Sequence, residues 1–152
     1  MSLEDDIAFF EQVPTFAALG KQALHILAIG AETRQLQNGA VLFYAGETAD
    51  AGYVVQRGAL VLETNSALSG EQFIAGPGTL VNERALFAET VCNSTAIARG
   101  PTVVVRISRS LFRKMMEGYP DAAQKLRDMM ADRVGGWMHE LNKLKRTLER
   151  PS

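Results

Sequence analysis

The sequence predicts a mainly β protein, an antiparallel jelly-roll or β-roll barrel with flanking helices, and three observations carry this prediction. Short apolar or alternating runs separated by glycine-containing turns fill the chain from Thr33 to Ser108. Apolar residues at helical spacing precede these runs, and a stretch with a heptad-like apolar repeat follows them. We therefore expect a single domain, 1–152, made of N-terminal helices (1–32), a β-roll (33–108) and C-terminal helices (109–152).

The N-terminal region is expected to form two helices that cap the barrel. Its helical pattern runs from Leu3 to Ala31 and breaks near Pro14, because proline removes a helical hydrogen bond. The apolar positions after the break recur at spacings of three and four: Leu19, Ala23, Leu24, Leu27 and Ala28. Such a stripe predicts a helix with one face against the core.

The middle of the chain is expected to form the strands of the barrel. The expected strands are Val41 to Tyr44, Tyr53 to Gln56, Leu60 to Glu63, Phe73 to Ala75, Thr95 to Ala98 and Thr102 to Ile107. Asn38-Gly39, Arg57-Gly58 and Ser69-Gly70 are turn signals between them. Many short strands joined by such turns are typical of a jelly roll.

Two helices are expected to end the chain. Ser108 is a suitable cap for a short helix through Met116, and Pro120-Asp121 is a suitable start for a longer one to Leu148. Apolar residues of the long helix alternate in steps of four and three: Leu126, Met130, Val134, Trp137, Leu141, Leu144 and Leu148. This seam predicts a parallel homodimer. The alternative is that the stripe packs back on its own domain.

The segment from Gly78 to Phe87, followed by Asn93 to Ala98, resembles the phosphate-binding cassette of cyclic-nucleotide-binding domains. This is the family of catabolite activator protein, protein kinase A regulatory subunits and cyclic-nucleotide-gated channels. Further pieces match in the same order: Phe16 to Leu19, Gly39 to Glu47, Gly52 to Leu60 and Tyr119 to Asp121. The resemblance implies a short cassette helix near Glu83, a long dimerisation helix, and a cyclic AMP, cyclic GMP or other nucleotide ligand.

The cassette resemblance also implies the candidate ligand-binding residues. They are Leu80, Val81, Asn82, Glu83, Arg84, Cys92, Asn93, Ser94 and Trp137. Glu83 would take the ribose 2′-hydroxyl, and Asn82 stands where the family has glycine, a position that asparagine tolerates because it accepts positive φ. The arginine that takes the cyclic phosphate is missing, since its position holds Cys92 or Asn93. Ordinary cyclic AMP binding is therefore in question, because a charge-assisted bond contributes about 1.5–3 kcal/mol.

Several of these residues have a second interpretation. Arg84 substitutes for the missing cation or points outward, and Glu83 binds ligand or pairs with Arg84 or Arg99. Trp137, directly after Gly135-Gly136, stacks on a purine or fills the dimer core. Cys92 is a redox sensor or a small buried apolar residue.

Composition argues against several other classes of protein. The formal charge is −1, so a nucleic-acid binder is not expected, and the basic tail after Leu141 is interpreted as a solvated helix end rather than a nucleic-acid patch. No run approaches the roughly 20 apolar residues of a membrane span, and the acidic start lacks the basic region of a signal peptide, which favours a cytoplasmic protein. One cysteine and two distant histidines, His25 and His139, make no metal-ligand spacing. An enzyme of the cupin type is therefore not expected.

These observations favour a stand-alone regulatory or sensor domain that binds a small ligand and signals through its dimerisation helix. The alternative is a degenerate, ligand-free scaffold for dimerisation or for docking a partner protein. Direct DNA recognition is not expected, because the chain ends at Ser152 without room for a helix-turn-helix domain after the dimer helix.

Overall fold

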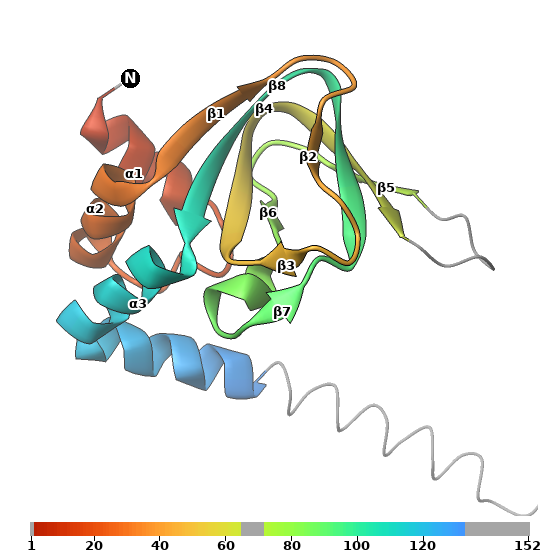
Figure 1. Cartoon of the computed structure of the whole chain (residues 1–152). Coiled ribbons are helices and arrows are strands. Elements are labelled where there is room, and N and C mark those ends of the chain that lie inside the picture. The colour runs from red at the N-terminus through yellow and green to blue at the C-terminus, as the bar shows by residue number, and fades with distance from the viewer. Residues whose placement is uncertain (1, 65–71, 133–152) are drawn as a thin grey trace, which may run out of the picture.

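A computed structural model describes residues 2–64 and 72–132, and it contains a folded β-roll with helices gathered on one side (Figure 1). The helices are α1 (Leu3–Glu11), α2 (Lys21–Gly30) and α3 (Arg109–Gly118), with the 3₁₀ helix η1 (Glu83–Leu86) inside the roll region. Residues 120–132 form a further helix. The strands are β1 (Glu32–Leu36), β2 (Val41–Phe43), β3 (Thr48–Ala49), β4 (Ala51–Thr64), β5 (Gln72–Ala75), β6 (Leu80–Val81), β7 (Thr90–Val91) and β8 (Ser94–Ser108). The predicted fold class is confirmed.

The strands form two antiparallel sheets. The six-stranded sheet has the order β1-β8-β4-β5, with β2 also paired to β8 and β6 to β4, and the small sheet pairs β3 with β7. The described strands do not close into a barrel, which corrects that part of the prediction. β1 and β5 lie at opposite ends of the strand order, and the two long strands β8 and β4 lie between them.

Each long strand replaces two predicted short ones. β4 and β8 pair over most of their length, with register shifts on either side of Arg57. The predicted turn at Arg57-Gly58 is wrong: Gly58 has φ 77° within β4 and forms part of a bulge. A β-carbon there would lie 2.4 Å from the carbonyl oxygen of Pro101, so glycine permits close approach of the two strands. Glycine signals turns and bulges alike, and composition does not separate them.

Apolar side chains form two core clusters on opposite faces of the roll. Neighbouring residues of β4 show the division, because Val54 belongs to the cluster under the helices and Val55 to the cluster inside the roll. The helix cluster is built on aromatic and aliphatic residues such as Phe10, Phe16 and Phe112. Burying each such side chain contributes about 1.5–3 kcal/mol, which holds the helices against the roll.

The helix starts follow the capping residues. Ser2 and Asp5 form a capping box at α1, and the Ser108 hydroxyl accepts a hydrogen bond of 3.1 Å from the Leu111 backbone N–H at the start of α3. The predicted break near Pro14 separates α1 from α2. The predicted break near Pro14 and the predicted cap at Ser108 are confirmed, whereas the capping box at Ser2 and Asp5 was not predicted.

The last helix begins at residue 120, as predicted, and its first turns pack on the chain's own domain. Leu126 is buried in the helix cluster and Met130 packs against that cluster. The remaining seam positions and Gly135-Gly136 lie outside the described residues, so the homodimer stays a prediction. Across residues 2–64 and 72–132, no helix has the combined length and apolar composition that spanning a bilayer requires.

Candidate ligand-binding site

Most of the predicted site residues surround one cavity of about 320 Å³. The cavity lies among β6, η1, β7 and the start of β8, with Leu62 of β4 also in its wall. Seven of the nine candidates line it: Leu80, Val81, Asn82, Glu83, Arg84, Asn93 and Ser94. The volume falls within the range of about 300–1,000 Å³ that is usual for small-ligand sites.

The cassette turn depends on Asn82. This residue has φ 62° and ψ 38°, the left-handed conformation, and it directly precedes η1. Among the residues that the structure describes, it is the only one besides glycine with positive φ. The expectation that asparagine preserves a turn built for glycine is confirmed, because asparagine tolerates this region better than most residues.

Glu83 is the first residue of η1 and stands between two cavities. It lines the cassette cavity and also a neighbouring cavity bordered by Val13, Pro14 and Thr15. The Thr15 hydroxyl donates a hydrogen bond of 2.6 Å to Oε2 of Glu83. A carboxylate has two oxygens and about four acceptor positions, so this bond leaves Glu83 the chemical capacity to accept from a ligand hydroxyl as well.

Charge around the cavity is balanced. Arg84 is exposed and lines the cavity, and among the described lining residues it carries the only positive charge, beside the negative Glu83. Asn93 and Ser94 also line the cavity and offer neutral hydrogen-bonding groups. The cavity therefore offers a carboxylate, an amide and a hydroxyl for polar contacts, with Arg84 as the single cation among its described lining residues.

Cys92 and Asn93 lie on different sides of the chain. Asn93 is exposed and lines the cassette cavity, whereas Cys92 is buried in the core cluster inside the roll. The Asn82 side-chain amide donates to Sγ of Cys92 at 3.3 Å, which ties β7 to the cassette turn. Of the two residues that the alignment leaves open for the phosphate position, the geometry places Asn93 at the cavity.

The environment of Cys92 lowers the reactivity of its thiol. Burial raises the pKa of Cys92, the hydrogen bond from Asn82 opposes this shift, and the negative charges of Glu47 and Asp50 add to the rise. A protonated thiol is a poor nucleophile. The buried environment matches the interpretation of Cys92 as a small core residue.

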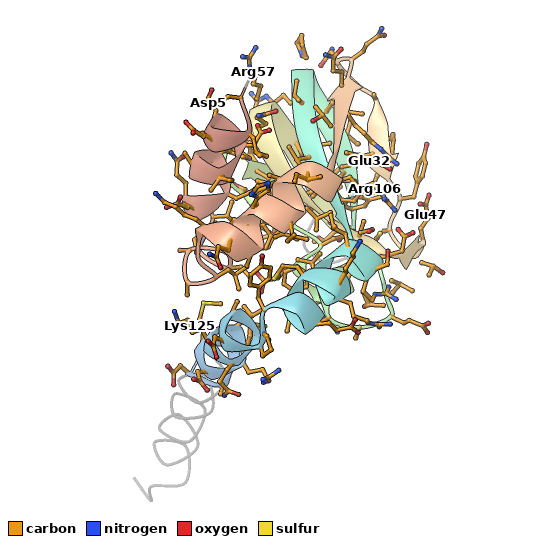
Figure 2. All side chains as sticks on the ribbon, turned by 90° about the vertical axis from the view of Figure 1, so that its left-hand side faces the viewer. Asp5, Glu32, Glu47, Arg57, Arg106 and Lys125 are labelled. Carbon is orange, nitrogen blue, oxygen red and sulfur yellow. The ribbon has the colours of Figure 1, made fainter. Side chains whose placement is uncertain are left out.

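Cys92 also borders a second cavity of about 230 Å³, together with Tyr53 and Arg106. Both arginines of its wall, Arg34 and Arg106, form ion pairs within the protein. Arg106 lies 3.2 Å from the carboxylate of Asp50 and 3.8 Å from that of Glu32, and Figure 2 shows Arg106 beside Glu32 at the edge of the sheet. Trp137, the ninth candidate, lies outside the described residues.

Two residues that the sequence did not single out hold the cassette in place. One is Thr15. The other is Arg109, the first residue of α3, whose Nε donates to the carbonyl oxygen of Ala85 at 2.8 Å and whose Nη2 donates to that of Ala49 at 2.6 Å. No local pattern reveals these contacts, because the partners are 68, 24 and 60 positions apart in sequence.

Comparison with known proteins agrees with this geometry. The family model for the cyclic nucleotide-binding domain matches residues 33–119. A cyclic nucleotide-binding-like protein from Brucella abortus has a similar structure with a TM-score of 0.66 and 36% identity, covering 74% of this chain and 98% of that one. The N-terminal domain of a transcriptional regulator from Streptomyces coelicolor A3(2) shares the fold with a TM-score of 0.80 at 24% identity, covering 88% and 94%.

A curated relative of a different kind is lysophospholipase NTE1 of Pyricularia oryzae, 29% identical over 118 residues. That match covers 76% of this chain but 8% of the lysophospholipase, so the similarity concerns one part of a much longer protein. The family model spans more than half of the chain and includes the cassette and its cavity. This chain therefore belongs to the cyclic nucleotide-binding domain family.

Proposed function

We propose that this chain is a regulatory module that binds a nucleotide in the cassette cavity, with Glu83 accepting from the ribose and Asn93 and Ser94 facing the phosphate. The observation that carries this proposal is the gathering of seven candidate residues, from β6, η1, the start of β8 and the connections beside them, around one cavity. The role is binding rather than catalysis. Family membership makes cyclic AMP and cyclic GMP the first ligands to test.

Weak binding of ordinary cyclic nucleotides follows from the same geometry. The neutral Asn93 lines the cavity, and it is one of the two residues, with Cys92, that the cassette resemblance aligns with the family's phosphate-binding arginine. Loss of one charge-assisted bond lowers affinity by about one to two orders of magnitude. Arg84 partly compensates, since an exposed cation at the cavity edge attracts an anion through water.

The output of the module is proposed to run through the C-terminal helix of a cytoplasmic homodimer. Supporting this, η1 is joined to α3 by the Arg109 hydrogen bond to Ala85, and α3 leads directly into the helix that begins at residue 120. A ligand that favours one position of η1 then favours one position of α3, which is the differential contact that a switch requires.

The second candidate function is a ligand-free scaffold for dimerisation or for docking a partner protein. It is favoured by the neutral side chain that Asn93 places at the cavity. Isothermal titration with cyclic AMP, cyclic GMP and a panel of linear nucleotides separates the two functions. Saturable binding of one nucleotide supports the regulatory module. Heats indistinguishable from dilution for the whole panel at millimolar ligand reject it in favour of the scaffold.

A further inference from the structure

The loop between α1 and α2 presents one polar side chain to the cassette. Its backbone is tied into turns by hydrogen bonds such as Phe16 N–H to the Val13 carbonyl at 2.9 Å. Val13 and Phe16 are fully buried and anchor the loop in the helix cluster. Thr15 between them is 2% exposed, and its hydroxyl reaches Glu83. A fixed loop therefore holds a fixed donor against the cassette.

We propose that Thr15 is a positioning residue for ligand binding: it holds the Glu83 carboxylate in the orientation that accepts the ribose hydroxyl. This inference rests on the proposed function of the cavity. The contact of 2.6 Å is as short as hydrogen bonds from hydroxyl groups to ionised carboxylates. Glu83 borders two cavities, and the bond from Thr15 fixes the direction of one of its carboxylate oxygens between them.

The physical effect is pre-organisation. A glutamate side chain has three rotatable bonds, and ordering it upon binding opposes affinity. The Thr15 bond orders one carboxylate oxygen before ligand arrives. Removing it should weaken binding about 10-fold for a ligand whose hydroxyl Glu83 accepts, since that factor corresponds to the entropy of fixing one such side chain. A ligand without that hydroxyl gains nothing from an oriented Glu83.

The test compares two variants and two ligands. Thr15→Val keeps the shape of the buried side chain and removes the hydroxyl, whereas Thr15→Ser keeps the hydroxyl. Dissociation constants of the full chain for cyclic AMP and for its 2′-deoxy analogue are measured by NMR titration, which follows binding into the millimolar range. We expect Thr15→Val to raise the dissociation constant for cyclic AMP about 10-fold and to leave that for the 2′-deoxy analogue unchanged. Thr15→Ser should bind both ligands as the wild type does.

Equal loss for both ligands would mean that Thr15 supports the fold rather than Glu83, and no loss for either would also overturn the inference. A second measurement needs no ligand: the rate of hydrogen exchange of the backbone amides at residues 83–88. Faster exchange in Thr15→Val than in Thr15→Ser supports positioning of the cassette, and identical exchange overturns it. If the wild type binds neither nucleotide, the proposed function fails. The hydrogen-exchange rates then decide whether Thr15 orders the cassette.

Discussion

At the scale of single residues, the neutral side chain of Asn93 limits how tightly the cavity holds a phosphate-bearing ligand. Asn93→Arg should increase the affinity for cyclic AMP by about one to two orders of magnitude, because it adds one charge-assisted hydrogen bond. Asn93 is exposed at the cavity, so a longer side chain is accommodated without disturbing the core. Isothermal titration of the variant and the wild type measures the change.

Two controls accompany this substitution. Asn93→Gln lengthens the side chain without charge and should give no gain. Cys92→Arg buries a cation in the cluster inside the roll, where Cys92 is 4% exposed, and should lower the melting temperature rather than improve binding. Unchanged affinity in Asn93→Arg would favour the ligand-free scaffold.

The buried thiol of Cys92 leads to a prediction about pH. Because burial raises the pKa of Cys92 above its ordinary value of 9.0, the folded protein should react with a thiol-specific disulfide reagent much more slowly at pH 8 than the unfolded chain. Labelling rates with and without denaturant measure this. The protonated thiol contributes stability that is complete below about pH 9 and is lost as the pH rises through the folded pKa. Equal labelling rates in the folded and unfolded states would contradict the description of Cys92 as a buried, protonated thiol.

Features that depend on a single residue could be predicted from the sequence. Hydrogen bonds between residues far apart in the sequence could not. The tolerance of Asn82 for positive φ and the capping role of Ser108 depend on each residue's own side chain, and both were predicted. The bond between Thr15 and Glu83 depends on how α1 packs against the roll, which no periodicity of the sequence encodes.

At the scale of secondary-structure elements, Arg109 connects α3 to the cassette and to the small sheet. Its backbone N–H also donates to the Asp50 carbonyl at 2.8 Å, so one residue links α3, η1 and the turn after β3. Arg109→Met should lower the free energy of unfolding by about 1.5–3 kcal/mol, since two carbonyls lose a charged donor. Urea denaturation followed by circular dichroism measures the loss.

Arg113 provides the matched control for this prediction. It lies on the same helix and is exposed, so Arg113→Met should change the free energy of unfolding by about 0.5 kcal/mol or less. A similar loss in both variants would show that removal of charge from α3, rather than the contacts of Arg109, explains the effect.

Element types were predicted better than element lengths. Apolar runs located the helices and four of the eight described strands, but they missed β1, β3, β6 and β7. In addition, β4 and β8 are each continuous where two runs were expected. The bulge around Gly58 bends β4 without ending its pairing with β8. Strand continuity is thus decided by the neighbouring strand, and a turn signal in one strand carries no information about that neighbour.

At the scale of the whole molecule, the cassette is held from both ends of the described chain. Thr15 reaches it from the loop after α1, and Arg109 reaches it from the start of α3. The helix cluster packs α1, α2, α3 and the first turns of the last helix together on one face of the roll. Leu86 of η1 belongs to the same cluster, so the cassette and the first turns of the last helix share one packed core, which is consistent with the proposed signalling.

The last prediction concerns assembly through that helix. The apolar seam continues beyond the described residues as Val134, Trp137, Leu141 and Leu144. Replacing Leu141 and Leu144 with Asp should convert a dimer to monomers, because charges at facing seam positions are buried without partners. Sedimentation equilibrium at high micromolar protein measures the mass.

A double variant off the seam controls for charge. Asn142→Asp with Lys143→Gln makes the net charge more negative by two, the same change as the seam variant, at positions outside the apolar repeat. It should remain dimeric, because only seam residues meet across a parallel helix pair. A wild-type chain that sediments as a monomer at high micromolar concentration would instead mean that the stripe packs on its own domain, as Leu126 already does in the described part of the helix.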